Sequence, residues 1–315
     1  MITVKFCIVG LGSIGSRHLK NMHQIAKDKN IAIEVHALRS SQVSLSDDIA
    51  RLVFKSTTNI ADLDAVYDAI FITNPSHKHY ETLLNLRAYS NVFFIEKPVF
   101  HSSSIEMHSI GKDNSLRCYV AAPMRYSALM IALKKQLKHE KVYSARALSS
   151  SYLPQWRPTL DYRKVYSSKK EQGGGVELDI IHELDYLIDL FGFPEELMHY
   201  GSQVSHLEIN SNDIATYIGR YTDKHIELHL DYFGKKTRRE LELICENYTI
   251  YADFISGTLK FVSENEEKIE VFPEDRNSAY LKEMDYFFEI LFNNVKNNNT
   301  IMHAFEILKL ALNTR

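Results

Sequence analysis

The stretch that decides the fold is "GLGSIG", residues 10–15, which follows a run of β-forming residues, Val4–Val9. It matches the pattern G-x-G-x-x-G, which joins a strand to a helix in dinucleotide-binding folds and also arises by chance in tight turns. In the dinucleotide-binding fold the first glycine allows the turn, the second lets a pyrophosphate approach the backbone, and the third brings the helix close to the sheet. The phosphate then meets the free N–H groups of the helix N-terminus. The predicted cofactor-binding residues of this loop are Gly10, Gly12, Ser13, Ile14 and Gly15.

Strand-like and helix-like stretches alternate around this loop, which is the pattern of βαβ units in a parallel sheet. The strand-like runs are almost continuously apolar, as in strands that are covered on both faces. They are Val4–Val9, Ala32–Leu38, Ala69–Thr73, Val92–Ile95 and Arg117–Ala121, with helical stretches at Ile14–Ala26 and His79–Ala88. The sequence therefore predicts an α/β protein whose residues 1–122 form a Rossmann dinucleotide-binding domain.

From residue 142 onward the pattern changes to short strand-like segments separated by turn residues, such as "DIATYIGRY", "KHIELHLDY" and "RELELIC". Such segments are typical of an antiparallel sheet with one packed face. A helix is predicted at Val176–Leu190, and another, with one apolar face, at Tyr280–Phe292. Residues 123–315 are therefore predicted to form a second, α+β domain with an open, largely antiparallel sheet.

The composition excludes several classes of function. The chain has 315 residues, of which 24% are charged, and a formal net charge of −3. Nucleic-acid-binding domains are usually clearly basic, so this charge balance argues against nucleic acid as a partner. No apolar run approaches the ~20 residues of a membrane span, and the first strand begins too early to leave room for a signal peptide. Three widely spaced cysteines in strand-like runs are typical of buried thiols in a reducing compartment. We therefore expect a cytoplasmic protein with no membrane partner.

The end of the second strand-like run predicts which nicotinamide cofactor binds. NAD-binding domains carry an Asp or Glu there, which binds the 2′-hydroxyl of the ribose. Here the run ends at Leu38 and is followed by Arg39, Ser40 and Ser41. Glu34 lies four residues before Leu38, which is roughly 13 Å from the end of the strand. A cation with two hydroxyls suits a 2′-phosphate, so Arg39, Ser40 and Ser41 favour NADP(H) over NAD(H).

Two further strand ends carry polar residues, at the edge where open α/β sheets bind ligands. The predicted cofactor contacts there are Thr73, Asn74, Pro75, His77, His79, Glu96 and Lys97. For the two histidines, exposure at the start of a helix is an equally good explanation. Lys97 would project beside the nicotinamide, with Glu96 to orient it. A partly desolvated amine beside a cationic ring gives up its proton more readily, so Lys97 is a candidate acid or base.

A second candidate group lies in "GGGVELDIIHELD", residues 173–185. Asp179, His182 and Asp185 follow one another at spacings of three, and residues three apart are neighbours on a helix. A histidine beside a carboxylate can carry a proton near neutral pH, and the preceding glycines would allow close approach of a ligand. Structural capping or bridging of the helix is the alternative explanation. Nothing in this pattern requires a metal.

Together, "GLGSIG", "TNPSHKHY", "EKP", "MRY" and "GGGVELDIIHELD" resemble the Gfo/Idh/MocA family of nicotinamide-dependent sugar oxidoreductases over essentially the whole chain. The resemblance implies an N-terminal Rossmann domain and a C-terminal α/β domain for substrate binding and oligomerisation. It implies that Lys97 and His182 handle the substrate proton with help from Asp179, and that Arg125 lies near cofactor or substrate. A homodimer or homotetramer is expected on the same grounds.

One departure from the family pattern concerns Asp179. Many members place the Asp four residues before the His, whereas Asp179 precedes His182 by three and Leu178 stands at the four-back position. On a continuous helix this spacing would rotate the carboxylate away from its usual direction.

The segment "YLPQWRPTLDYRKVYSSKKEQGGG" also resembles a branch of the family that is found with bacterial surface-sugar pathways. Trp156 is a candidate to stack on a sugar ring, and Arg157 and Arg163 are candidates to bind an anionic group. Packing under a long loop is the alternative for Trp156.

The predicted function is therefore an NADP(H)-dependent oxidoreductase that acts on a secondary hydroxyl or carbonyl of a sugar, sugar acid or sugar nucleotide. Two alternatives remain open at this point. One is a glycosidase that oxidises its sugar transiently on a retained nicotinamide, and the other is a non-catalytic cofactor-binding sensor or structural subunit. The presence of both Lys97 and His182 argues against the last.

Overall fold

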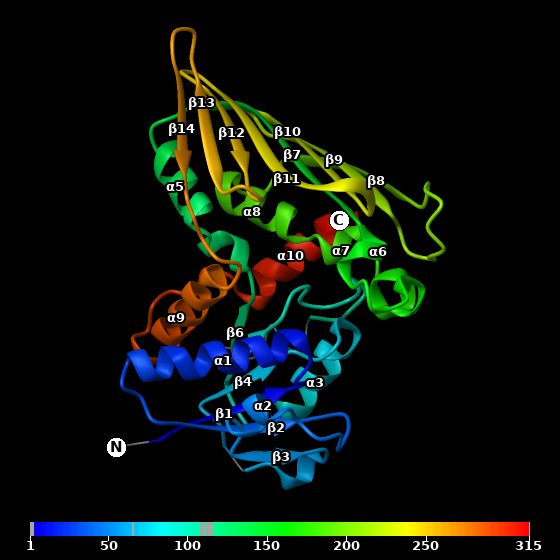
Figure 1. Cartoon of the computed structure of the whole chain (residues 1–315), viewed down its shortest axis with the longest axis vertical. Helices are drawn as coiled ribbons and strands as arrows, with labels where there is room; N and C mark the ends of the chain where they lie inside the picture. Colours follow the sequence, from blue (N-terminus) through cyan, green and yellow to red (C-terminus); the bar gives the residue numbers. More distant parts are fainter. Residues whose placement is uncertain (1–2, 65, 108–109, 111–115, 315) are drawn as a thin grey trace. The chain divides into compact units, whose positions relative to one another are not determined.

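The computed structural model describes residues 3–64, 66–107, 110 and 116–314. The contacts within it form two compact units, which together account for the elements labelled in Figure 1. One unit comprises Met1–Ala122 and Tyr280–Phe305, and the other comprises Pro123–Ala279 and Glu306–Arg315. Each unit has its own sheet and its own core.

The first unit contains a six-stranded parallel sheet in the order β3-β2-β1-β4-β5-β6. In chain order its strands are β1 Val4–Val9, β2 Ile33–Leu38, β3 Lys55–Thr57, β4 Ala69–Ile72, β5 Val92–Ile95 and β6 Arg117–Val120. This is the strand order of a dinucleotide-binding Rossmann fold, in which the order reverses between β1 and β4. The predicted Rossmann fold is confirmed, and its five predicted strands end within one residue of the observed bounds. The three-residue β3 was not predicted.

The helices of the first unit connect and cover these strands. Within the described residues they include α1 Ser13–Asp28, α2 Asp47–Ala50, α3 His79–Leu86 and most of α9 Ser278–Phe292, with short 3-10 turns at Ile60–Asp62 and Ser76–Lys78. Helix α10, Ile301–Ala311, crosses the division between the units after Phe305. Among the described residues, no helix combines the length and apolarity needed to cross a membrane.

The C-terminal part of the chain departs from the predicted division into 1–122 and 123–315, because residues 280–305 pack with the first unit. The aromatic face of α9 explains this return. The ring of Phe287 lies 5.2 Å from that of Phe71 and 5.3 Å from that of Phe94, and Phe288 lies 5.7 Å from Phe6. Burial of such side chains stabilises the fold by about 1.5–3 kcal/mol each, which favours packing of α9 on the parallel sheet. The local sequence of α9 does not indicate which sheet it covers.

The second unit contains an eight-stranded sheet in the order β14-β13-β12-β11-β7-β10-β9-β8. In chain order its strands are β7 Val142–Tyr152, β8 Glu196–Ser202, β9 Ile214–Arg220, β10 His225–Asp231, β11 Phe233–Cys245, β12 Thr249–Asp253, β13 Thr258–Val262 and β14 Glu267–Val271. All neighbouring strands are antiparallel except β10 and β7. The predicted, largely antiparallel sheet is therefore confirmed. Side chains alternate along β10, where Ile226 and Leu228 are buried and Glu227 is exposed, so one face of the sheet is packed.

The helices of the second unit are α5 Ala128–Leu137, α6 Leu153–Trp156, α7 Val176–Asp179 and α8 His182–Phe191. Short 3-10 turns occur at Pro123–Tyr126, Tyr162–Lys164, Tyr166–Ser168 and Lys170–Gln172. The single helix predicted at Val176–Leu190 is wrong, because the chain leaves helical geometry at Ile180, whose φ is −106° and ψ is 27°. The turn buries both Ile180 and Ile181, which a continuous helix would place on different faces. Asp179 therefore ends one helix and His182 begins the next.

Candidate active site

Gly10, Gly12 and Gly15 of the opening loop have, in that order, a positive φ, open space at the Cβ position and a close backbone contact there. Gly10 has a φ of +88°, and a Cβ on it would lie 3.0 Å from Cα of Asn74. A Cβ on Gly15 would lie 2.1 Å from the carbonyl oxygen of Gly10, so only glycine lets α1 pack this close to the turn. A Cβ on Gly12 would have nothing within 4 Å. The loop is therefore closed on its protein side and open at Gly12, which is the side a pyrophosphate would approach.

Thr73 and Asn74 support this loop from the neighbouring strand. The hydroxyl of Thr73 lies 2.7 Å from the carbonyl oxygen of Gly10 and 3.0 Å from that of Val9. The amide of Asn74 donates to the hydroxyl of Thr82 at 2.8 Å, which holds the strand end against α3. Both predicted residues thus lie at the carboxyl edge where β1 and β4 end side by side.

Lys97 lies at the same edge, directly after β5, the neighbour of β4. It is the one residue between Val92 and Phe100 that is not buried, and its peptide bond to Pro98 is cis. The carboxylate of Glu96 accepts the backbone N–H of Lys97 at 3.1 Å. The structure thus brings the glycine loop, Asn74 and a half-buried Lys97 to one edge of one sheet.

His18 is part of this edge and was missed from the sequence. Its side chain is completely buried in α1, and its Nε2 lies 2.5 Å from Oε1 of Glu96. Residue 18 is separated from residue 96 by 78 positions, so no local pattern links the two. The available signal was a histidine at the fifth position of the predicted helix Ile14–Ala26.

The two histidines that follow β4 differ in their surroundings. His79 is buried, and its ring nitrogens lie against the carbonyl oxygens of Asn74, Pro98 and Val99. Burial lowers the pKa of His79 despite these contacts. His79 therefore ties the loop after β4 to the segment after Lys97. His77 is half-buried, with its ring 6.4 Å from that of His101, and its contact with a cofactor stays a prediction.

Arg39, Ser40 and Ser41 follow β2 at the carboxyl edge, where Leu38 pairs with Val9. The guanidinium of Arg39 donates to the carbonyl oxygen of Val43, and both serines are exposed. Glu34 lies toward the opposite end of β2, where it pairs with Lys5. The position of these residues is the one that the sequence predicted, while their contact with a 2′-phosphate stays a prediction.

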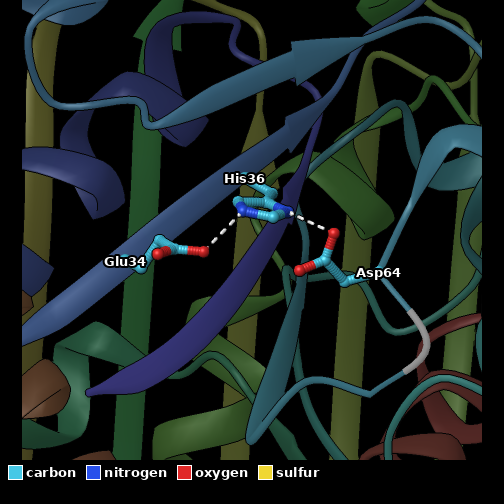
Figure 2. Close-up of side chains that lie close together, drawn as sticks. All are labelled: Glu34, His36 and Asp64. Carbon is cyan, nitrogen blue, oxygen red and sulfur yellow. Dashed lines mark hydrogen bonds and ion pairs between the residues drawn. The ribbon is translucent and has the colours of Figure 1, made fainter.

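Glu34 instead belongs to a cluster with His36 and Asp64, whose candidate ligand atoms lie within 4.8 Å of one another (Figure 2). The imidazole of His36 stands between the two carboxylates, 2.9 Å from Glu34 and 3.9 Å from Asp64. The ammonium of Lys5 lies 2.8 Å from Asp64, and that of Lys55 lies 3.5 Å from it. Because two lysines already supply the positive charge, we assign no metal to this cluster.

In the second unit, the carboxylate of Asp179 is buried between two phenols. The hydroxyl of Tyr232 donates to Oδ2 of Asp179 at 2.6 Å, and Tyr166 forms a further hydrogen bond to Asp179. The charge of Asp179 and burial raise the pKa of Tyr166, and burial together with Asp179 raises that of Tyr232. Both phenols therefore remain protonated donors at neutral pH. They fix the direction of Asp179 that the spacing to His182 left open.

His182 begins α8 and is the one residue between 173 and 188 that is not buried. Buried ion pairs hold this helix. The guanidinium of Arg125 donates to both oxygens of Asp185, at 2.8 and 2.7 Å, and Nε of Arg239 lies 2.6 Å from Glu183. The structure thus gives Arg125 a structural partner, and its contact with cofactor or substrate stays a prediction. Asp185 anchors the helix on which His182 is presented.

Backbone conformation and packing require glycine at the three positions before α7. Gly173 has a φ of +80° and Gly175 a φ of +127°, both in the left-handed half of conformational space. A Cβ on Gly174 would lie 2.3 Å from the carbonyl oxygen of Tyr166. Close approach of the 166–169 backbone accounts for Gly174, and positive φ accounts for Gly173 and Gly175, while the approach of a ligand to these glycines stays a prediction.

The tryptophan and arginines of the long loop have distinct surroundings. Trp156 is 40% exposed, its indole N–H donates to the hydroxyl of Ser151, and its ring packs edge-on against Tyr232 at 5.2 Å. The guanidinium of Arg157 lies 5.8 Å from the ring centre of Tyr166. Trp156 and Arg157 thus adjoin the two tyrosines that hold Asp179. Arg163, in contrast, pairs with Asp161 and Glu208 and is not part of this group.

Comparison with known proteins identifies the two units. Residues 4–120 match the model of an oxidoreductase family with an NAD-binding Rossmann fold, and residues 140–311 match that family's C-terminal alpha/beta domain. A search of the curated proteins found no significant match.

Several solved structures share the fold over nearly the whole chain. The UDP-N-acetylglucosamine 3-dehydrogenase GnnA from Acidithiobacillus ferrooxidans has a TM-score of 0.78 at 17% identity, covering 100% of this chain and 97% of its own. A levoglucosan dehydrogenase in complex with NADH and levoglucosan has a TM-score of 0.84 at 13% identity, with 99% and 97% covered. An oxidoreductase from Agrobacterium radiobacter, in complex with NAD+, L-tartaric acid and magnesium, has a TM-score of 0.79 at 14% identity, with 98% and 94% covered.

The glycine loop and Lys97 at one sheet edge, the Asp179–His182 segment and the match of both domain models agree with one another. The chain belongs to the Gfo/Idh/MocA family and is an NAD(P)-dependent oxidoreductase.

Proposed function

We propose that the protein transfers a hydride between NADP(H) and a secondary hydroxyl or carbonyl of a sugar, sugar acid or sugar nucleotide. The observation that carries this proposal is the position of Lys97, half-buried within an otherwise buried segment and on the same sheet edge as the glycine loop. Two of the proteins that share the fold are described as sugar dehydrogenases, which supports a sugar as substrate.

Each of the predicted site residues has a distinct role in this proposal. The open side of Gly12 and the N-terminus of α1 bind the pyrophosphate, since a helix N-terminus carries partial positive charge. The bound nicotinamide supplies the hydride chemistry. Lys97 and His182 are the two groups that take or return the proton of the substrate hydroxyl, and either one can polarise the carbonyl. Asp179, fixed by two phenols, orients the substrate in the second unit.

The sugar-binding part of the proposal rests on the group around Asp179. Trp156 offers a partly exposed ring, and a tryptophan face suits the C–H face of a sugar ring. Arg157 adds an exposed cation beside it, which suits a carboxylate or phosphate on the substrate. The oligomer expected from the resemblance stays a prediction, which light scattering on the purified protein would check.

The first experiment is a titration of the purified protein with NADPH and with NADH, followed by nicotinamide fluorescence. Tighter binding of NADPH supports the proposal, tighter binding of NADH refutes the cofactor preference, and binding of neither refutes the dinucleotide site. Arg39→Asp tests the origin of the preference. Because a charge-assisted contact is worth about 1.5–3 kcal/mol, its loss should weaken NADPH binding by roughly 10- to 100-fold and leave NADH unchanged.

The acid–base roles are tested by screening sugars and sugar nucleotides for turnover with the wild type and with Lys97→Met and His182→Asn. General acid–base catalysis contributes typically 10²–10⁴-fold, so loss of the proton carrier should lower kcat by roughly that factor while NADPH binding persists. A Lys97→Met variant with near-normal kcat would exclude Lys97 as acid or base. Lys164→Met, at an exposed position in the second unit, serves as the control.

A further inference from the structure

His18, Glu96 and Lys97 form a connected chain of contacts inside the first unit. His18 is fully buried in α1, and its Nε2 lies 2.5 Å from Oε1 of Glu96. Glu96 is itself buried at the end of β5, and its other oxygen accepts the backbone N–H of Lys97 at 3.1 Å. Helix α1 begins at Ser13, directly after the glycine loop. One buried carboxylate therefore joins the helix that follows this loop to the residue that presents an amine at the sheet edge.

The pKa of Glu96 depends on its contacts with His18 and Lys97. Burial by itself would raise the pKa of Glu96, but the hydrogen bond from His18 and the charges of His18 and Lys97 outweigh burial and lower it. A buried carboxylate that loses its donor would return toward the raised pKa that burial imposes. Lys97 would then stand beside a neutral acid instead of an anion.

The surroundings of His18 leave one direction for its hydrogen bond. Its ring packs against Phe94, with the ring centres 4.8 Å apart, and against Tyr280 at 6.1 Å. Its Nδ1 is buried and has no hydrogen-bond partner among the described residues. The Nε2 contact to Glu96 is thus the polar contact that this imidazole makes, and a purely apolar ring would fill the same space.

Two other ionisable groups, His79 and Arg17, lie near the contacts of His18 with Glu96. His79, on α3, is buried, lies near enough for the charge of Glu96 to act on it, and has a lowered pKa. The guanidinium of Arg17 lies over the ring of Tyr280, 4.6 Å from its centre. Among the described residues, the side-chain hydrogen bond to Glu96 comes from His18, so His18 is the side chain that a substitution must change.

We propose that His18 is a positioning residue for Lys97: by donating its Nε2 proton to Glu96, it keeps that carboxylate charged and bound to the backbone of Lys97. The consequence for reactivity rests on the proposed function of Lys97, whereas the contact itself does not. His18 touches neither the substrate nor the reacting atoms and acts through Glu96.

Two substitutions separate the hydrogen bond from packing. His18→Phe keeps an aromatic ring against Phe94 and removes the donor. His18→Gln can place an amide N–H near the position of Nε2 and so keep the donor. Far-UV circular dichroism and thermal unfolding establish that each variant is folded before any other measurement.

The main readout is the rate at which acetic anhydride acetylates Lys97 in the full-length protein, followed by peptide mass spectrometry as a function of pH. The free amine reacts, so the midpoint of the curve reports how readily Lys97 loses its proton. We expect His18→Phe to move this midpoint to lower pH by about 0.5–1 pH unit, because Glu96 becomes neutral more easily. His18→Gln should remain close to the wild type. Lys27, exposed on the same helix, is the internal reference and should not change.

A folded His18→Phe variant with the wild-type Lys97 curve would overturn the proposal, as would equal shifts in His18→Phe and His18→Gln. If His18→Phe does not fold, Glu96→Gln removes the carboxylate while His18 stays in place, and it should give the same shift to lower pH. An unshifted Lys97 curve in Glu96→Gln would then overturn the proposal.

Turnover separates this proposal from the proposed function. With a substrate in hand, His18→Phe should lower kcat about tenfold with KM for NADPH within threefold, and His18→Gln should restore most of kcat. If Lys97→Met keeps near-normal kcat while the acetylation curve of Lys97 still responds to His18→Phe, the positioning contact stands and the catalytic role of Lys97 falls. If Lys97→Met is inactive and the curve does not respond, the reverse holds.

Discussion

Two glycines of the same loop should respond in opposite ways to the same substitution, which makes Gly12→Ala and Gly15→Ala a matched pair. A methyl group on Gly12 would meet nothing within 4 Å, and the φ of −72° at this position suits any residue. A methyl group on Gly15 would lie 2.1 Å from the carbonyl oxygen of Gly10 and 2.7 Å from the hydroxyl of Thr73. One substitution therefore changes the open side of the loop, and the other changes its packing.

The expected stability of each variant follows from these contacts. At Gly12, the helix N-cap, alanine is the poorer cap, but it lowers the entropy of the unfolded chain by about 0.4–1 kcal/mol, so the two effects nearly cancel. At Gly15, overpacking costs typically 1–3 kcal/mol and the neighbour is backbone, which cannot rotate away. Loss of the Thr73–Gly10 hydrogen bond adds about 1 kcal/mol, against about 1 kcal/mol gained from the helix propensity of alanine. The net loss of about 1–3 kcal/mol corresponds to a Tm roughly 2–10 °C lower.

Cofactor binding should show the opposite order. The methyl group of Gly12→Ala stands where the pyrophosphate approaches, so the Kd for NADPH should rise at least tenfold, about 1.4 kcal/mol, with an unchanged Tm. The assays are thermal unfolding without ligand and fluorescence titration with NADPH. A Gly12→Ala variant that binds NADPH like the wild type would refute the assignment of this loop to the pyrophosphate. A Gly15→Ala variant with wild-type stability would refute the packing argument.

Three further predictions concern buried charges. Arg125→Leu leaves the buried carboxylate of Asp185 without its bidentate partner, so the free energy of unfolding measured in urea should fall by about 3–5 kcal/mol. The double variant with Asp185→Leu should recover a large part of this loss. Tyr232→Phe removes the 2.6 Å hydrogen bond to Asp179 and should lower the free energy of unfolding by about 1–3 kcal/mol; an unchanged value would show that this phenol does not hold the carboxylate. The pKa of Glu96 is lowered in the folded state, so its contribution to stability is present above the ordinary glutamate pKa and is lost as pH falls through the folded value. The difference in unfolding free energy between wild type and Glu96→Gln should therefore shrink from pH 6 to pH 3, and a constant difference would contradict the lowered pKa.

The sequence by itself determined the strands and turns whose conformation depends on residues close to them in the sequence. Apolar runs of four to six residues became buried parallel strands, because both faces of such a strand must be covered. The glycine spacing of the opening loop reflects backbone contacts within a few residues and with the neighbouring strand end. The loop, and the position of Lys97 after a strand end, could therefore be predicted from the sequence.

Only the tertiary structure decided which partners the polar residues have. Arg125 meets Asp185 across 60 positions, and His18 meets Glu96 across 78, so no local pattern distinguishes an anchoring arginine from a ligand-binding one. The break at Ile180 and the return of α9 to the parallel sheet have the same cause. In each case the chain gains burial against surfaces formed by distant segments, and that gain outweighs the preference of the local sequence.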